Sequence, residues 1–223
     1  MRNARTSGCG TDAVLRLHDY WRSSAAYRVR IALHLKGLAY EAVAIDLLAG
    51  AQGQAANRAV NPQGLVPSLL LEDGTALTQS LAILQWLDET RPEPPLWPRE
   101  PVARAKASAQ ALLVAADIHP LNNLRVLQRL QNQFGADAQA KSDWYRHWIV
   151  LGLAALEEMA GGPGSFLGGA APNVADVCLV PQLFNARRFE VDLALYPALV
   201  AADAAASALP AFQAAHPERA RPA

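Results

Sequence analysis

The chain of 223 residues contains only two cysteines, Cys9 and Cys178. One lies in a polar N-terminal stretch and the other in an apolar run, so a disulfide framework is not expected. An excess of charge is missing too, because 20 lysines and arginines balance 20 aspartates and glutamates. A chain without net charge exerts no general attraction on nucleic acids or anionic membranes. We therefore expect a cytoplasmic protein that binds neither nucleic acid nor membrane.

Longer signals are also missing. No uncharged apolar run approaches the ~20 residues of a membrane span. Residues 1–13 hold two arginines but no apolar segment after them, which predicts a flexible extension rather than a secretory signal. The five histidines lack metal-ligand spacing, and no GxGxxG, Walker or GxSxG motif occurs. The sequence thus offers no support for a metal site, a nucleotide site or a serine hydrolase.

What is present is apolar sequence, at 52% hydrophobic residues, which is enough for a substantial core. Residues 14–91 predict strand, helix, strand, then a hairpin around Asp73-Gly74 and a second helix. The strands are expected at 14–20, 40–47, "SLLLE" and "ALT", and the helices at 24–36 and from Ser80 onward. This βαβ-ββα order predicts a small α/β domain.

Five prolines between Pro92 and Pro101 predict a stiff linker over residues 92–100. After it, alanine and leucine dominate and no strand is evident. Residues 101–223 are therefore expected to form an all-helical domain, with helices near 101–118, 120–134, 139–160, 173–187 and 197–208. The predicted fold class is α/β followed by all-α.

Two adjacent serines, Ser23 and Ser24, open the first predicted helix. They either cap it or hold an anion, since a hydroxyl can donate and a helix start offers free N–H groups. A hydrogen bond to a charged group contributes roughly 1.5–3 kcal/mol, and the helix dipole adds about 0.3–1 kcal/mol. Lowering a thiol pKa by two units needs about 2.7 kcal/mol. Because no cysteine lies nearby, such a thiol would come from a ligand.

Two other short motifs allow both a structural and a ligand-binding interpretation. Val66-Pro67 is either an ordinary strand entrance or a cis-proline turn that leaves the Val66 backbone free to pair with a peptide-like ligand. Gln79-Ser80 either caps the second helix or grips a carboxylate at its start. Together with the serine pair, these motifs suit a ligand that carries both a thiol and a carboxylate.

The C-terminal half contains one comparable segment, "DIHPLNNLR". Here His119-Pro120 interrupts a helix, and Asn122 and Asn123 follow just inside the next one. The segment is either a solvent-facing helix start or a polar wall that faces the first domain. By contrast, Asn173 and Asp176 have the spacing of a capping box, for which we favour a structural role.

Five stretches together resemble the zeta-class glutathione transferases, a family that includes maleylacetoacetate isomerases. They are "YWRSSAAYRVRIALHLKG", "NPQGLVPSL", "TQSLAILQWLDETRP", "DIHPLNNLRVL" and "ADVCLVPQLFNARRFEVDL". The resemblance runs from about Leu15 to Pro217. It implies a thioredoxin-like N-terminal domain, a helical C-terminal domain, bound glutathione and a homodimer.

The resemblance also implies roles for single residues. Ser23 and Ser24 match the serine pair that stabilises the glutathione thiolate, and Ser23 is the candidate for the principal hydroxyl. Val66, ahead of Pro67, would pair with the glutathione backbone. The further glutathione positions implied are the carboxylate clamp of Gln79 and Ser80, the loop residue Gln52, and the bordering His119, Asn122 and Asn123.

One departure from the family is Ala25, where many zeta sequences have a cysteine after the serine pair. A cysteine role is therefore not carried over, but isomerisation should survive because the glutathione sulfur does the covalent chemistry. The implied reaction is thiolate addition to a cis double bond, rotation and elimination. A dicarboxylate substrate requires cations, for which Arg22 and Arg188 are candidates. The alternative is that these arginines are simply solvated at the surface or form structural ion pairs.

The resemblance leaves four functions open. The first is maleylacetoacetate isomerisation in tyrosine and phenylalanine breakdown, and the second is maleylpyruvate isomerisation. The third is conjugation or dehalogenation of small α-halo acids. The fourth is a non-catalytic glutathione-fold module, against which the serine pair and Gln79-Ser80 argue.

Overall fold

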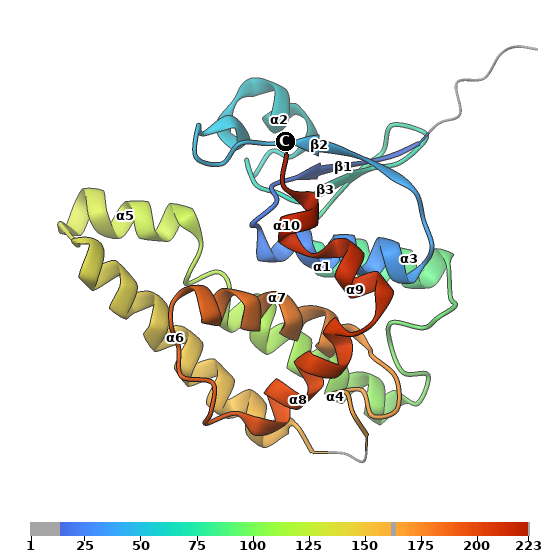
Figure 1. The fold of residues 1–223 in the computed structure, drawn as a ribbon. Helices are drawn as coiled ribbons and strands as arrows, with labels where there is room; N and C mark the ends of the chain where they lie inside the picture. The colour runs from blue at the N-terminus through green and yellow to red at the C-terminus, as the bar shows by residue number, and fades with distance from the viewer. Residues whose placement is uncertain (1–13, 162–163, 223) are drawn as a thin grey trace, which may run out of the picture.

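The computed structural model describes residues 14–161 and 164–222, so the predicted N-terminal extension and Cys9 lie outside the described residues. The first part of the chain folds around a four-stranded sheet in the order β2-β1-β3-β4 (Figure 1). Its strands are β1 (Leu15–Asp19), β2 (Tyr40–Ala44), β3 (Ser68–Leu70) and β4 (Ala76–Thr78). β1 pairs parallel with β2, as a βαβ crossover requires, and antiparallel with β3. β3 and β4 form the antiparallel hairpin.

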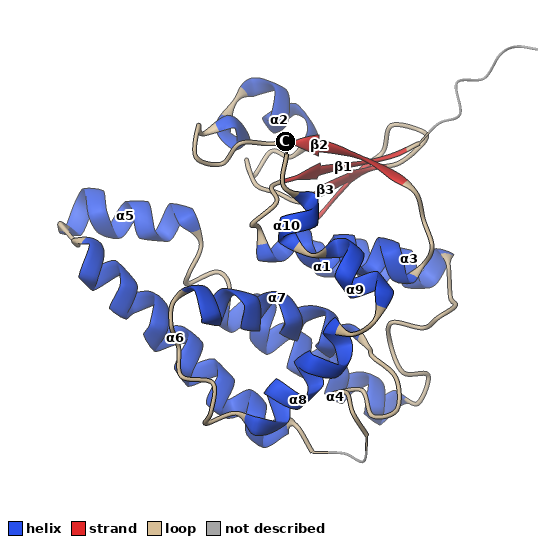
Figure 2. Ribbon diagram, viewed as in Figure 1, coloured by secondary structure: helices blue, strands red, loops and turns tan. Residues whose placement is uncertain are grey.

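Helices α1 (Ser24–Leu35) and α3 (Ser80–Thr90) lie between the sheet and the helical half of the chain (Figure 2). Their apolar residues, together with Leu17 and Leu69 of the sheet, form a core that is sealed from solvent. The polar loop after β2 carries two short helices, η1 (Ala51–Gly53) and α2 (Ala55–Val60). This arrangement confirms the predicted thioredoxin-like domain.

Two local predictions for this half can be compared with the structure. Asp73 and Gly74 form the predicted hairpin turn, because Gly74 has φ 86° and the Asp73 carboxylate accepts the Thr75 N–H at 2.8 Å. The Val66-Pro67 peptide bond, whose isomer the sequence left open, is cis.

The rest of the chain is helical, as predicted. Residues 91–100 form neither helix nor strand and lead into α4 (Pro101–Leu112) and the π-helical segment η2 (Leu113–Ile118). The helices that follow are α5 (Leu124–Phe134), α6 (Ala138–Met159), α7 (Val174–Arg188), α8 (Pro197–Ser207), α9 (Pro210–Ala215) and α10 (Pro217–Ala220).

The helix predicted over 120–134 was wrong in its first four residues. The Asn123 side chain caps α5 by accepting the Arg125 N–H at 3.2 Å, so the helix begins at Leu124. The short helices α9 and α10 were not predicted, because segments of six and four residues are too short to show a helical period. The predicted capping box of Asn173 and Asp176 is confirmed at the start of α7, where Asp176 is fully buried.

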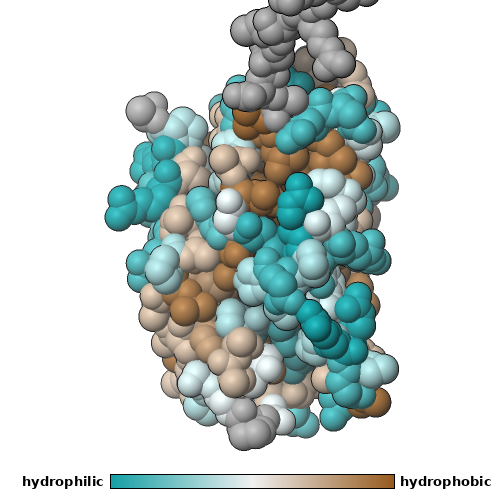
Figure 3. All heavy atoms as spheres, turned by 90° about the vertical axis from the view of Figure 1, so that its right-hand side faces the viewer, coloured by the Kyte–Doolittle hydropathy of each residue, from teal (hydrophilic) through white to brown (hydrophobic). Residues whose placement is uncertain are grey.

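The two halves share one core. Helix α7 packs against α1, and α9 also lies along α1, so the C-terminal segment returns to the first domain (Figure 1). Figure 3 shows one face on which hydrophilic side chains are interspersed with hydrophobic patches. Over residues 14–161 and 164–222, no helix has the length and apolar character needed to cross a membrane.

Candidate active site

Two adjoining cavities lie where the two halves meet. The Ser80 cavity has a volume of about 410 Å³ and the Ser23 cavity about 400 Å³, each named after one residue of its wall. Both walls include Gln63, Leu65, Val66, His119, Asn123 and Arg125, so the two cavities lie side by side along these residues. A ligand that reaches Ser23 at one end and Ser80 at the other would pass along Val66.

All the site residues predicted from the sequence lie in these walls. The Ser80 cavity is lined by Val66, Pro67, Gln79, Ser80, His119 and Asn123. The Ser23 cavity is lined by Arg22, Ser23, Ser24, Gln52, Val66, His119, Asn122, Asn123 and Arg188. Residues from six separate stretches of sequence therefore converge on these two adjoining cavities.

Ser23 takes the capping role that the sequence left open, and its hydroxyl hydrogen is still free to donate. Its Oγ accepts the Ala26 N–H at 3.2 Å and so caps α1, while Ser24 is the first residue of the helix. Capping uses only a lone pair of the hydroxyl, so the hydroxyl hydrogen stays available for an anion in the cavity. The helix start adds its own N–H groups and partial positive charge.

Two arginines of the Ser23 cavity are held by neutral groups. Arg22 donates from Nη2 to the Tyr20 hydroxyl at 2.9 Å, and Arg188 donates from Nη1 to Asn185 Oδ1 at 3.3 Å. Burial lowers the pKa of Arg188, and the charge of Arg22 acts in the same direction. The two cations are therefore close enough to repel each other, and a bound anion would relieve that repulsion.

Acidic side chains are missing from this wall. No aspartate or glutamate lines the Ser23 cavity, and neither Arg22 nor Arg188 has a carboxylate within 4.0 Å in the described part of the chain. The neighbouring Arg187, by contrast, points elsewhere and pairs with Asp203 at 2.6 Å. The cavity thus concentrates positive charge without compensation, as a site for a dicarboxylate requires.

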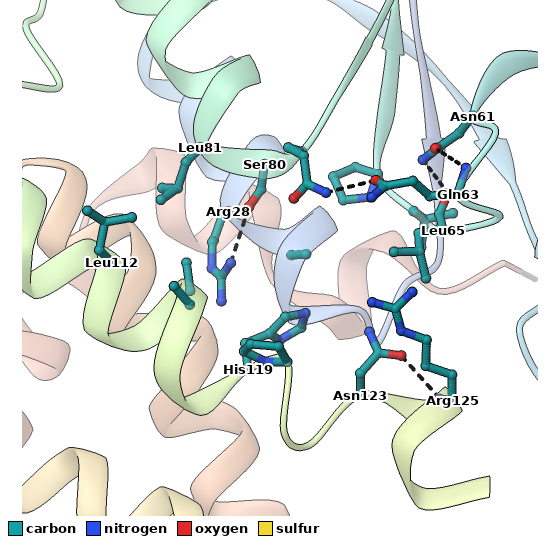
Figure 4. A pocket seen from close by; sticks show the side chains of 17 residues that line it. Arg28, Asn61, Gln63, Leu65, Ser80, Leu81, Leu112, His119, Asn123 and Arg125 are labelled. Atoms are coloured by element: carbon teal, nitrogen blue, oxygen red, sulfur yellow. Dashed lines mark hydrogen bonds between the residues drawn. The ribbon is translucent and has the colours of Figure 1, made fainter. Parts of the chain in front are cut away.

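The Ser80 cavity has unusual backbone at its edge. Gln79 has φ 67°, a left-handed value that is rare outside glycine, and it donates from Nε2 to Gln63 Oε1 at 2.8 Å. Backbone held in such a sparsely populated region is often found at ligand-binding sites. It presents Ser80, the first residue of α3, to the cavity (Figure 4).

Val66 lines both cavities, and its backbone groups are unpaired in the described part of the chain. No hydrogen bond joins its N–H or C=O to any other residue in the described segments. The loop that carries it is fixed by Asn61, which donates from Nδ2 to the Leu65 carbonyl at 3.0 Å. A peptide-like ligand would find one free donor and one free acceptor here.

The segment with His119, Asn122 and Asn123 turns out to be both a helix start and a wall toward the first domain. Burial, helped by the charge of Arg28, lowers the pKa of His119 to about 3, so its imidazole is neutral at physiological pH. Asn122 donates from Nδ2 to the Tyr145 carbonyl at 3.2 Å, and its Oδ1 is buried without a partner. These groups can act as neutral donors and acceptors but not as cations.

The walls also hold residues that sequence reasoning missed, among them Tyr20, Arg28, Arg125 and Asn185. Arg125 could have been found, because it directly follows the "NNL" stretch and lines both cavities. Arg28 shares its helix with Arg30 and His34, and no local pattern distinguishes it from them. Gln52, which was predicted, has a buried Oε1 without a partner. No cluster of His, Cys, Asp or Glu suited to a metal occurs among the residues that the structure covers.

Comparison with known proteins agrees with this geometry. Residues 17–95 match the family described as glutathione S-transferase, N-terminal domain. The maleylacetoacetate isomerase of Rhizobium meliloti (strain 1021) is 51% identical over 208 residues, which cover 92% of this chain and 97% of the relative.

Solved structures of the same kind are also similar. The maleylpyruvate isomerase described as a bacterial zeta-class glutathione S-transferase superposes with a TM-score of 0.89 at 42% identity, covering 92% of this chain and 97% of its own. A maleylacetoacetate isomerase from Anaeromyxobacter dehalogenans 2CP-1, with dicarboxyethyl glutathione and citrate in its active site, gives 0.83 at 50% identity, covering 92% and 95%. The chain therefore belongs to the zeta-class glutathione S-transferases, in the family of the maleylacetoacetate isomerases.

Proposed function

We propose that this protein is a glutathione-dependent isomerase that converts maleylacetoacetate into fumarylacetoacetate, a step of tyrosine and phenylalanine breakdown. The observation that carries the proposal is the Ser23 cavity. There, a serine pair at a helix start shares one wall with two arginines that no carboxylate of the described residues neutralises. Such a cavity suits a thiolate and a dicarboxylate together.

The first half of the site holds glutathione. Its residues fit that ligand, because Val66 offers unpaired backbone groups and Gln52 a buried amide oxygen without a partner. Gln79 and Ser80 would take the glutamyl carboxylate at the start of α3. Pro67, His119, Asn122 and Asn123 would border the tripeptide along the two cavities.

The second half of the site serves the reaction. Bound glutathione supplies a thiolate whose reversible addition to the double bond permits rotation from cis to trans. Ser23 donates to the sulfur and keeps it ionised, with Ser24 beside it. Arg22 and Arg188 bind the substrate carboxylates and stabilise the negative charge that develops on the substrate during addition.

A second candidate is maleylpyruvate isomerisation, which the similarity to a maleylpyruvate isomerase favours. The two substrates share the maleyl end that the arginines would bind, so this end of the site serves either. The dehalogenation or conjugation of small α-halo acids stays open as a third activity, since it needs the same thiolate.

We further propose that the protein works in the cytoplasm as a homodimer, with residues 14–91 binding glutathione and residues 101–223 binding the substrate. The resemblance to the zeta-class family, whose members are usually dimeric, supports the homodimer. Sedimentation is expected to give twice the 23.9 kDa of one chain. A monomer at micromolar concentration would contradict this part of the proposal alone.

The decisive experiment follows isomerisation of freshly made maleylacetoacetate and maleylpyruvate, with and without glutathione. The Ser23→Ala variant should lose ~10²-fold or more of kcat, because one preorganised donor to the reacting anion is removed. Ser24→Ala is the matched control for the serine pair. The faster substrate identifies the physiological reaction. If neither substrate turns over while glutathione binds, the isomerase proposal is wrong and the dehalogenase takes its place.

A further inference from the structure

Arg28 is the unexplained charge of this site. It lies in the middle of α1, is 1% exposed and lines the Ser80 cavity. Its guanidinium makes one hydrogen bond, from Nη1 to Ser80 Oγ at 3.1 Å, while Nε and Nη2 are buried without a partner. In the described part of the chain, no carboxylate forms an ion pair with it.

A buried guanidinium without a countercharge is strongly unfavourable, since burial removes its hydration and nothing replaces it. The surroundings show the effect. Burial lowers the pKa of Arg28, and its charge contributes to the low pKa of His119. Arginine keeps its proton in proteins, so the chain maintains an uncompensated cation at this position. Such an arrangement persists where it has a use.

The hydrogen bond to Ser80 points to that use. Ser80 Oγ accepts from Arg28, so the Ser80 hydrogen is directed away from the guanidinium and can be donated to a ligand. Figure 4 shows the Arg28 side chain reaching Ser80, with His119 beyond its other side. The cation, the oriented hydroxyl and the start of α3 thus act on the same part of the cavity, and all three favour an anion.

We propose that Arg28 is a positioning residue that makes the Ser80 cavity selective for a carboxylate. The glutamyl α-carboxylate of glutathione supplies the countercharge that the chain omits. It accepts a hydrogen bond from the Ser80 hydroxyl, which Arg28 orients by donating to Ser80 Oγ. The inference deepens the proposed function by assigning the residue behind the carboxylate clamp. It predicts that thiol peptides without this carboxylate are poor ligands.

The test compares two probes by calorimetric titration. One is glutathione, and the other is γ-aminobutyryl-cysteinyl-glycine, which keeps the thiol, the amine, both peptide bonds and the glycyl carboxylate but lacks the glutamyl α-carboxylate. The wild type should prefer glutathione by about 10–100-fold, the range expected for one hydrogen-bonded charge. Ser80→Ala should reduce this preference.

The variants then isolate Arg28. Arg28→Met should weaken glutathione by about 10–50-fold and change the affinity of the second probe by less than about twofold. Arg28→Lys, which keeps the charge, should recover part of the loss. The KM for glutathione should rise while kcat at saturation stays within about threefold. Arg16→Met, at an exposed position of β1, is the matched control and should change neither affinity.

Each outcome of these titrations supports or contradicts the role proposed for Arg28. Equal losses for both probes would show that Arg28 merely supports the fold, and unchanged affinity for glutathione would show that it has no role in binding. If Arg28→Met does not fold, a wild type that binds both probes equally overturns the proposal without any variant. Absence of isomerisation with intact discrimination would contradict the proposed function and leave the role of Arg28 standing.

Discussion

Arg28 and Arg30 lie two residues apart in the same helix, and each is 1% exposed, yet their surroundings are opposite. Arg30 binds both oxygens of Asp19 at 2.7 and 2.9 Å and donates to the carbonyls of Trp21 and Ala215, each at 3.0 Å. Arg28 donates only to Ser80. The chain supplies every partner where the buried charge is structural. Where a partner is missing, we infer that a ligand supplies it.

Arg30 also connects the ends of the molecule to the site. Its contact with Ala215 holds α9 against α1, and its contact with Trp21 fixes the turn that carries Arg22 and Ser23. The Ser23 N–H donates to the Tyr20 carbonyl at 2.8 Å within the same turn. The geometry of the serine pair therefore depends on a residue that lies outside both cavity walls.

The largest effect is expected for Arg30→Met. It leaves Asp19 buried without a countercharge, which should lower the free energy of unfolding by about 3–5 kcal/mol. Burial raises the pKa of Asp19 even with Arg30 present, and Arg30 is the larger of the two stabilising partners, the other being a backbone hydrogen bond at Tyr20. Urea denaturation measures the change, with the exposed Arg16→Met as control. A loss below about 1 kcal/mol would remove the contrast between the two arginines.

Helix α7 also carries one arginine with a carboxylate partner among the described residues, Arg187, and one without, Arg188. Arg188→Ala should lower kcat/KM by about 10–100-fold, since it removes a hydrogen-bonded charge from the substrate carboxylate. Arg187→Ala should instead lower stability by about 1–3 kcal/mol and leave kcat/KM nearly unchanged, because its partner Asp203 is buried. Steady-state kinetics and urea denaturation separate the two. Similar kinetic losses in both variants would refute the assignment of Arg188 to the substrate.

The site residues that the sequence could predict share a position in the fold. Ser23, Val66 and Ser80 lie at or within two residues of the first residue of a helix or strand. Prolines, turn dipeptides and caps mark such places locally. The fold class, the hairpin at Asp73-Gly74 and the cavity-lining motifs were therefore accessible from the sequence.

Arg28 was not accessible in the same way. The role inferred for Arg28 depends on its contact with Ser80, which lies 52 residues further along the chain, and on the lack of a carboxylate partner among the described residues. Neither feature is visible in a local sequence pattern. Helix α5 begins four residues later than predicted because the Asn123 side chain caps it. Contacts between distant segments thus determine the features that the sequence left open.

The third prediction uses His119, the neutral neighbour of Arg28. Its pKa of about 3 in the folded state lies below the ordinary value of 6.5, so the unfolded chain binds the extra proton. Its contribution to stability is present above pH 6.5 and is lost as the pH falls toward 3. At pH 5 the loss amounts to about 2 kcal/mol.

Replacing the histidine tests this pH dependence. His119→Gln should unfold like the wild type at pH 7 but lose less stability at pH 5, as measured by urea denaturation at both values. The exposed His147→Gln is the control and should keep the wild-type response. Parallel pH profiles for His119→Gln and the wild type would show that the imidazole is not held neutral.

The smallest expected change is the most informative about the two arginines of α1. Without ligand, Arg28→Met should alter the free energy of unfolding by less than about 1 kcal/mol or raise it, because replacing an uncompensated buried charge by an apolar side chain removes an unfavourable term. With glutathione at 100 times the wild-type Kd, the wild type should gain about 2.7 kcal/mol, and the variant should gain less because it binds more weakly. Thermal and urea unfolding with and without glutathione measure both quantities. A loss of about 3–5 kcal/mol without ligand, equal to that of Arg30→Met, would mean that Arg28 is structural as well, and the difference between the two residues would no longer identify a ligand-dependent charge.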